Sequence, residues 1–365
     1  MKKIIFTVTN DLAYDQRMIR ICTSLTTAGF EITLVGIQKN SSLSLPLRPY
    51  KQVRLPVWFK KGAIFYIESN CRIFFFLLFT RADLLCCIDL DTMMPVWLAS
   101  IIKNKKRVYD AHEYFSQQKE IVTRPRIYKI WHWIEKHFVP RFLNGYTVGR
   151  AIANKFKQIY KVDYEVIRNV PLLKPSIPFT GKRNKNILYQ GAVNEGRGLE
   201  YLIPAMKLVN ATLLIYGDGN FIDQTKSIIA SNNLQHKVFL KGKVLPEELG
   251  LITSQNYIGL NLVENIGLNQ YYSLANKFFD YIHHLVPQVT MDFPEYKTIN
   301  EQFEIGLLLP NLKQITIANG INKLLNDDLL YERLKSNCVK ARNILNWQKE
   351  EETLVQFYKK LLANK

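Results

Sequence analysis

A short polar segment near residue 276 has the spacing needed to hold a phosphorylated ligand. Asn276 and Asp280 are four residues apart and Lys277 precedes Asp280 by three, so one side of a helix would carry all three. Ser273 is suited to cap the start of this helix. A lysine at a helix start is electrostatically unfavourable unless an anion lies beside it. We therefore expect a diphosphate near Lys277 and ribose hydroxyls on Asp280, with an ion pair between these two side chains on a solvated face as the alternative.

A glycine-rich segment, GAVNEGRG at 191–198, directly follows an apolar run. Gly191 and Gly196 would let a ligand approach the backbone, and Arg197 offers a forked cation for phosphate oxygens. Gly217 opens a second short glycine segment, GDG, after the next apolar run. These positions extend the expected phosphate site.

Two further polar segments follow apolar runs in the first half of the chain. Asp89 and Asp91 could hold Mn²⁺ or Mg²⁺ through a nucleotide diphosphate, or Asp91 could begin a turn or a helix. His112 follows the run 107–110 and is either a structural residue or a ligand contact. The chain lacks G-x-G-x-x-G after the first apolar run, a Walker lysine motif and H-E-x-x-H, which argues against dinucleotide oxidoreductases, P-loop NTPases and zincins.

Short apolar runs alternate with helix-length amphipathic segments along the whole chain. The runs are mostly continuous, which is typical of parallel strands covered on both faces by helices. Such alternation predicts an α/β fold with a doubly wound sheet, whose ligands bind at the carboxyl ends of the strands. The pattern occurs twice, so we expect two Rossmann-like domains. The expected strands are 4–9, 32–36, 84–88, 107–110, 146–148, 187–190, 212–216, 238–241, 257–262, 286–290 and 307–309.

Prolines and a basic cluster separate the two halves of this pattern. Proline blocks the continuation of a helix and is typical of linkers. We expect an N-terminal domain over 1–170, a linker over 171–185, a C-terminal domain over 186–345 and a terminal helix within 346–365.

The composition is that of a globular protein. Of 365 residues, 47% are hydrophobic and 22% are charged, which excludes a disordered, collagenous or coiled-coil chain. The charge-free apolar run 73–79 is shorter than the ~20 residues of a membrane span, and the apolar start of the chain is too short for a signal peptide. The five cysteines form no C-x-x-C pair, so neither structural zinc nor a disulfide framework is expected. We expect a cytoplasmic protein.

Positive charge is concentrated in the first half. Residues 1–165 contain 26 Lys and Arg against 13 Asp and Glu, whereas residues 166–365 contain 23 against 18. This asymmetry favours an anionic partner. The segment 124–142 mixes cations with aromatic residues, as does Phe59-Lys60-Lys61, which suits a peripheral position on an anionic inner membrane face. A helix packed under the first sheet is the alternative, and nucleic-acid binding lacks a recognisable motif.

In order and spacing, several segments resemble the GT-B glycosyltransferases, and within them glycosyltransferase family 4. They are ILYQGAVNEGRGLEYLIPAM (187–206), LLIYGDG (213–219), VFLKGKVLPEEL (238–249) and YYSLANKFFDYIHHLVPQV (271–289), with weaker matches earlier in the chain. The resemblance implies two Rossmann-like domains facing a cleft, with the terminal helix crossing back to the first. The second domain would hold a sugar nucleotide, and the first domain most of the acceptor site.

The resemblance also implies roles for individual residues. Arg197 matches the cation that neutralises the diphosphate, and Lys277 would be a second cation there. Asp280 matches the carboxylate that holds the ribose. His112 would contact the transferred sugar, and Gly191 would allow close backbone approach.

One family feature is missing. Two glutamates separated by seven residues are usual, but here the second position is Asp280 and the first is Tyr272. Sugar contacts are therefore expected from the backbone amides of Tyr272, Ser273 and Leu274, or from Glu264. The glycine-rich loop usual after the first strand is also replaced, by the segment 10–14.

These features predict a hexosyltransferase. It would move a sugar from a nucleotide-diphosphate sugar, with retention and without metal or further cofactor, to a hydroxyl of a glycan or lipid-linked acceptor in cell-surface polysaccharide synthesis. Arg197, Lys277 and His112 would be its catalytic residues. The alternatives are a catalytically silent nucleotide-sugar-binding protein and a GT-B epimerase that acts on a sugar nucleotide.

Overall fold

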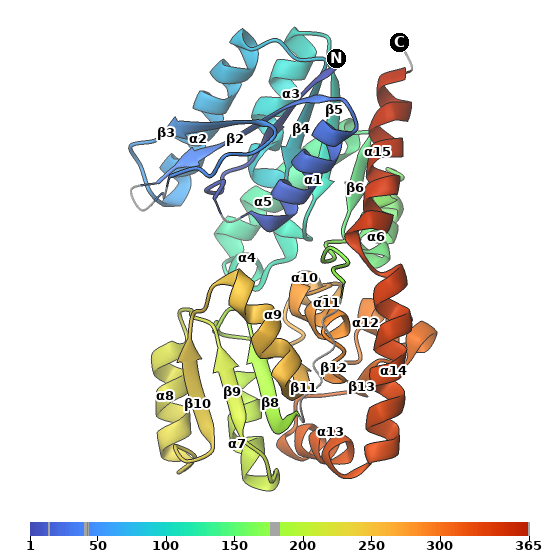
Figure 1. The fold of residues 1–365 in the computed structure, drawn as a ribbon. Coiled ribbons are helices and arrows are strands. Elements are labelled where there is room, and N and C mark those ends of the chain that lie inside the picture. Colours follow the sequence, from blue (N-terminus) through green and yellow to red (C-terminus); the bar gives the residue numbers. More distant parts are fainter. Residues whose placement is uncertain (14, 40–41, 43, 176–182, 364–365) are drawn as a thin grey trace. The chain divides into compact units, whose positions relative to one another are not determined.

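The chain forms two compact α/β units, each built on a parallel sheet (Figure 1). The computed structural model describes residues 1–365 except 14, 40–41, 43, 176–182 and 364–365. Unit 1 contains Met1–Asn169 and Lys349–Lys365, and unit 2 contains Val170–Gln348. Residues 176–182 of the expected linker lie outside the described residues.

Unit 1 has a seven-stranded sheet in the order β3-β2-β1-β4-β5-β6-β7. The strand order reverses between β1 and β4, and the loops after these two strands flank the position where open α/β sheets bind ligands. The strands are β1 Lys3–Thr7, β2 Glu31–Gln38, β3 Lys51–Pro56, β4 Leu84–Ile88, β5 Lys106–Ala111, β6 Gly145–Thr147 and β7 Glu165–Val166.

Helices cover both faces of this sheet. Tyr358 of α15 packs against Phe6 of β1, and α1 lies on the same face, in front of the sheet in Figure 1. On the other face α2, α3, α5 and α6 follow one another. The helices are α1 Gln16–Thr27, α2 Gly62–Phe79, α3 Met93–Ile102, α4 Lys119–Val122, α5 Pro125–Phe138, α6 Arg150–Tyr160 and α15 Trp347–Ala363, with 3-10 turns at Leu90–Thr92, Phe115–Gln117 and Val139–Arg141.

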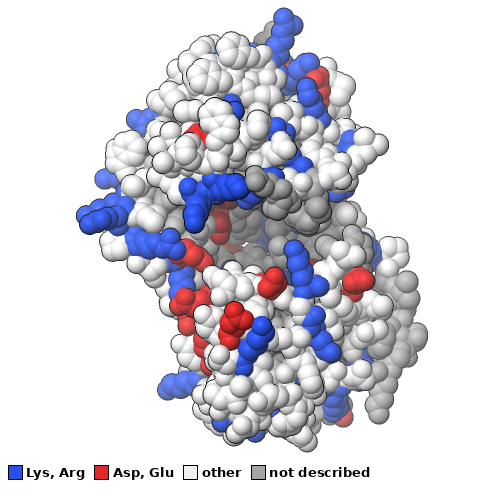
Figure 2. All heavy atoms as spheres, turned by 90° about the vertical axis from the view of Figure 1, so that its left-hand side faces the viewer, with Lys and Arg blue, Asp and Glu red and all other residues white. Residues whose placement is uncertain are grey.

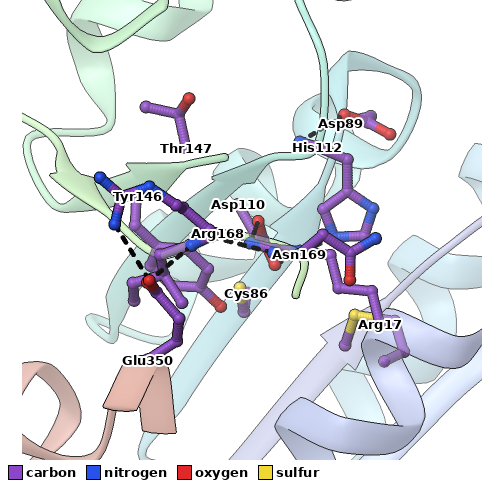
Figure 3. Close-up of polar contacts among 12 residues, drawn as sticks. Arg17, Cys86, Asp89, Asp110, His112, Tyr146, Thr147, Arg168, Asn169 and Glu350 are labelled. Carbon is purple, nitrogen blue, oxygen red and sulfur yellow. Dashed lines mark hydrogen bonds and ion pairs between the residues drawn. The ribbon is translucent and has the colours of Figure 1, made fainter. Parts of the chain in front are cut away.

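Polar contacts fix α15 on unit 1. Both carboxylate oxygens of Glu350 accept hydrogen bonds from Arg168, one from its backbone N–H at 2.8 Å and one from its guanidinium at 3.1 Å (Figure 3). The hydroxyl groups of Tyr146 and Tyr358 lie 3.1 Å apart in the core. The C-terminal helix is thus a structural part of the first unit.

Helix α2 is long and apolar enough, by length and composition, to cross a membrane, and it is the one described helix that meets this test. The expectation that the run 73–79 was too short overlooked that the helix begins at Gly62. In the fold α2 connects β3 to β4 of one sheet, and it packs against α3.

Unit 2 repeats the architecture with six strands in the order β10-β9-β8-β11-β12-β13, which reverses between β8 and β11. Its strands are β8 Asn184–Gln190, β9 Leu213–Tyr216, β10 Val238–Gly242, β11 Asn256–Asn261, β12 Gln288–Met291 and β13 Gly306–Leu309. Its helices are α7 Leu199–Ala205, α8 Ile222–Ser231, α9 Pro246–Gln255, α10 Leu268–Tyr271, α11 Asn276–His283, α12 Pro294–Phe303, α13 Gln314–Asn326 and α14 Asp328–Ile344, with a 3-10 turn at Met206–Leu208.

The predicted fold class is confirmed, and two strands were missed. β3 is an edge strand that contains Lys51, Arg54 and Pro56, so it lacks the apolar run that marks a buried strand. β7 has only two residues. Both lie at the edges of the first sheet, where one side of the strand has no neighbour and the apolar signal is weakest.

Candidate functional site

The glycine turns after β8 and β9 pack backbone on backbone at the carboxyl edge of the second sheet. The N–H of Gly191 donates to the carbonyl of Tyr216 at 2.9 Å. Gly217 has φ 145°, and a Cβ atom there would lie 1.8 Å from the carbonyl oxygen of Gly191. No side chain fits at Gly217, and both turns lie at the point where the strand order reverses.

Lys277 lies directly against the Gly191 turn. It is the second residue of α11, and a Cβ atom on Gly191 would be 3.7 Å from its Cε. Its ammonium nitrogen lies 3.8 Å from the centre of the Tyr189 ring. The structure thus brings together a lysine, a helix N-terminus and an open glycine turn, which are all features that attract an anion.

The electrostatics around Lys277 favour the binding of an anion. Burial, followed by the positive charge of Arg197, lowers the pKa of Lys277 well below its usual value. Within the described part of the chain, neither Lys277 nor Arg197 forms an ion pair. Two half-buried cations that repel each other would be stabilised by a diphosphate between them.

Asp280 does not pair with Lys277, so the alternative of an ion pair on a solvated face is wrong. One Asp280 oxygen instead lies 3.2 Å from the side-chain amide nitrogen of Gln190, which donates to it. Gln190 is itself held by the hydroxyl of Thr253, which donates to its carbonyl oxygen at 2.8 Å. Gln190, at the end of β8, therefore orients the Asp280 carboxylate. This carboxylate lies about one helical turn after Lys277 on α11.

The expectation that Ser273 caps the helix is also wrong. Helix α11 begins at Asn276, with Ala275 in the capping position and without a side-chain cap. The Ser273 hydroxyl donates to the carbonyl of Gln270 at 2.8 Å and lies 3.1 Å from the Tyr296 hydroxyl. That buried tyrosine hydroxyl accepts the Ala275 N–H at 3.1 Å, so a side chain from α12 fixes the residue that precedes the helix.

The amides expected to contact a sugar are only partly available. The N–H of Tyr272 donates to Leu268 at 2.9 Å, and that of Ser273 donates to Gln270 at 3.3 Å. Leu274 is the remaining candidate, because no hydrogen bond of its N–H occurs among the described residues. The other expected contact, Glu264, lies on a loop whose backbone N–H donates to the carbonyl of Gly196 at 3.0 Å, directly beside Arg197.

His112 lies in unit 1, at the end of β5, and is held on two sides (Figure 3). Its backbone N–H donates to Asp89 at 3.0 Å, and its Nε2 lies 3.1 Å from Asp110, which also pairs with Arg17 at 3.0 Å. Burial disfavours the imidazolium, but the charge and hydrogen bond of Asp110 outweigh it and raise the pKa of His112. Asp110 thus orients the ring and favours its protonated form.

Asp91 takes the structural role that was weighed against a metal site. It lies in the 3-10 turn Leu90–Thr92, and its carboxylate accepts a hydrogen bond from the Thr9 hydroxyl. Burial raises the pKa of Asp91 to about 6. Among the described residues, no group of three or more His, Cys, Asp or Glu is arranged to hold a metal ion.

Comparison with known proteins identifies the second half of the chain. Residues 174–341 match the family model of Glycosyl transferases group 1. Unit 2 is a group 1 glycosyltransferase domain. The match confirms the prediction of a glycosyltransferase. None of the curated proteins matches the chain.

Solved structures similar to the whole chain show the GT-B fold. A sucrose-phosphate synthase from Thermosynechococcus elongatus has a TM-score of 0.87 at 15% identity, and each chain is covered completely. HepE from Anabaena in complex with UDP-glucose has a TM-score of 0.78 at 12% identity, covering 99% of this chain and 100% of HepE. WaaG, a glycosyltransferase involved in lipopolysaccharide biosynthesis, has a TM-score of 0.75 at 12% identity, with the same coverage.

Some residues around the group 1 site were not singled out from the sequence. Tyr189 and Gln190 end β8 and orient Lys277 and Asp280, but as the last residues of an apolar run they look like ordinary strand residues. Their position at a strand end next to Gly191 was the available signal. In unit 1 the ion pair of Arg17 and Asp110 joins residues that are 93 positions apart, so a local sequence pattern cannot predict it.

Proposed function

We propose that the protein is a retaining, metal-independent hexosyltransferase that uses a nucleotide-diphosphate sugar. The observation that carries this proposal is that Lys277 and Arg197 are neighbouring cations, neither with an ion pair among the described residues, where the strand order of the second sheet reverses. The group 1 domain and the UDP-glucose complex of the structurally similar HepE support a nucleotide-sugar donor.

In this reaction the bond between the sugar and the diphosphate breaks, and negative charge develops on the departing phosphate oxygen. Fixed cations stabilise such charge most effectively in a site that excludes water. Lys277 and Arg197 would supply two positive charges there, so the transfer would need neither a metal ion nor a further cofactor. The open backbone at Gly191 and Gly217 would allow the diphosphate to approach.

The remaining expected residues would position the donor. Asp280, held by Gln190, would accept hydrogen bonds from two ribose hydroxyls. The Leu274 amide and Glu264 would contact the transferred sugar in place of the glutamate that Tyr272 replaces. His112, whose protonated form is favoured by Asp110, would contact the transferred sugar.

The acceptor would be a hydroxyl of a glycan or lipid-linked saccharide in cell-surface polysaccharide synthesis. The role of WaaG in lipopolysaccharide biosynthesis supports this class by structural similarity. We place the protein in the cytoplasm, where nucleotide sugars would reach it. Retention of configuration follows from the resemblance to family 4.

The test is transfer from UDP- and GDP-sugars to lipid-linked and soluble saccharides, with purified wild-type protein and single variants. Arg197→Ala and Lys277→Ala should each lower kcat by a factor on the order of 10²–10³, comparable to losing one oxyanion-hole donor. Lys241→Ala, an exposed lysine on β10, is the control and should keep wild-type activity. Full activity of both site variants would overturn the assignment.

The second candidate is a catalytically silent binding protein, and Tyr272 in place of a carboxylate is the observation that favours it. Such a protein would bind a nucleoside diphosphate but neither transfer nor hydrolyse its sugar. Nucleotide binding by calorimetry together with a transfer assay on the same sample separates the two functions.

A further inference from the structure

One side of unit 1 exposes a continuous apolar stripe along α2. Its outward residues are Ile64, Ile67, Cys71, Phe75 and Phe79, at spacings of three or four residues that place them on one side of the helix. Ile67, Phe75 and Phe79 are 64%, 57% and 86% exposed.

The opposite side of α2 is apolar as well. Phe65, Ile73 and Leu77 are buried in unit 1. A helix that is apolar all round normally has apolar surroundings all round, in a protein core or in lipid. In α2 only the side that carries Phe65, Ile73 and Leu77 has apolar surroundings, and the outward stripe faces solvent.

The exposed apolar surface continues onto the two neighbouring helices. Tyr66 of α2 packs edge-on against Trp131 of α5 with ring centres 5.1 Å apart, and Trp97 of α3 packs against Phe138 of α5 at 5.2 Å. We call the outward sides of these helices the α2–α3–α5 face. Besides the α2 stripe, its exposed apolar residues are Met94, Leu98, Ile101 and Ile102 on α3 and Ile127, Ile130 and Trp133 on α5.

Cations surround this face, and its carboxylates are engaged. The three helices contain two acidic residues. Glu68 accepts the backbone N–H groups of Trp58 and Phe59 and pairs with Arg72, while Glu135 is buried and accepts a hydrogen bond from Tyr160. The exposed cations at the margin are Lys60, Lys61, Arg81, Arg124, Arg126, Lys129 and Lys136.

Figure 2 views unit 1 from the side of β3 and α2 and shows mostly uncharged atoms, interrupted by Lys and Arg. Trp58 stands at the N-terminal end of α2 with 82% of its surface exposed, and the Arg72 guanidinium carbon lies 4.7 Å from the centre of its ring. An aromatic side chain next to cations is typical of proteins that lie at the interface of an anionic bilayer.

We propose that the α2–α3–α5 face docks on an anionic membrane surface, with the apolar stripe in the boundary between headgroups and acyl chains and the surrounding cations on lipid phosphates. A second copy of the chain fits this face poorly, because a two-fold interface would bring the same unpaired cations together. A spanning position is excluded for α2, because one of its sides is packed in the core of the unit. This inference rests on unit 1 alone and does not depend on the sugar chemistry of unit 2.

The test is flotation of the full-length protein with vesicles of phosphatidylcholine, with and without phosphatidylglycerol. Wild type should bind the anionic vesicles and lose binding at high salt. Phe75→Ser/Phe79→Ser should weaken binding more than about tenfold, because a buried phenylalanine contributes ~1.5–3 kcal/mol. Lys129→Gln/Lys136→Gln should weaken binding to anionic vesicles about 30-fold, since loss of one cation near the surface lowers the affinity about fivefold.

The matched control is Leu251→Ser/Leu329→Ser, which removes two apolar residues of unit 2 that are 61% and 87% exposed. It should float as wild type does. Binding to neither vesicle type, or equal binding by wild type and both face variants, would overturn the proposal. So would a wild-type dimer in light scattering that the phenylalanine variant converts to monomer without any vesicle binding. Nucleotide affinity of the face variants should stay at the wild-type value, which separates this test from that of the donor site.

Discussion

Replacing Lys277 by methionine should weaken nucleoside diphosphate binding and leave the fold intact. Methionine keeps a long unbranched side chain against Tyr189 but removes the ammonium group, whose nitrogen lies 3.8 Å from the ring centre. A hydrogen bond to a charged group contributes about 1.5–3 kcal/mol. Loss of one such bond to the diphosphate corresponds to a decrease in affinity of about 10- to 150-fold.

Isothermal titration calorimetry measures this effect directly. UDP, GDP and ADP are first titrated into the wild type, and the nucleotide that binds is then titrated into the variant. Lys241→Met is the matched control, because the Lys241 ammonium also lies over an aromatic ring, 5.6 Å from the centre of Phe239, but is exposed. The control should bind with wild-type affinity. A dissociation constant of Lys277→Met within about twofold of wild type would refute the reasoning.

Three further predictions concern Lys277, the glycine turns of unit 2 and the buried ion pair of unit 1. The pKa of Lys277 is lowered in the folded protein, so between that lowered value and 10.5 the unfolded chain binds one more proton than the folded chain. The free energy of unfolding of the wild type should therefore rise with pH over this window. Urea titrations at several pH values should show this rise in the wild type and not in Lys277→Met. Gly217→Ala would place a Cβ atom 1.8 Å from the Gly191 carbonyl oxygen. The variant should therefore be destabilised by ~1–3 kcal/mol and should not bind the nucleotide. Unchanged nucleotide binding in calorimetry would contradict the packing of the two turns. Arg17→Met leaves the buried Asp110 carboxylate without its guanidinium and should cost about 3–5 kcal/mol in urea unfolding, whereas a loss below ~1 kcal/mol would show that His112 alone compensates the charge.

The parts of the site that lie within one helix or turn could be predicted from the sequence. The glycine turns follow runs whose β identity was evident, and the spacing of Lys277 and Asp280 placed both at one sheet edge. Their partners could not be predicted, because Gln190 lies 90 residues from Asp280. Ser273 is not the cap because the helix begins at Asn276, where Ala275 occupies the capping position and a tyrosine from a later helix binds its N–H.

The exposed residues of α2 in unit 1 could not be predicted from the sequence. Basic and aromatic residues at 124–142 predicted an interfacial segment, yet the structure also exposes a continuous apolar stripe on α2. A helix that is apolar on all sides has no polar face from which to infer its orientation, so its sequence predicts burial. Only the packing of α2 on one side shows which residues are left outward.

The most direct test of the central claim is a crystal structure of the protein with the nucleoside diphosphate that binds. The account predicts that diphosphate oxygens lie within hydrogen-bonding distance of both the Lys277 ammonium and the Arg197 guanidinium, beside the Gly191 turn. A nucleotide bound elsewhere, or with its diphosphate turned away from these two cations, would contradict it.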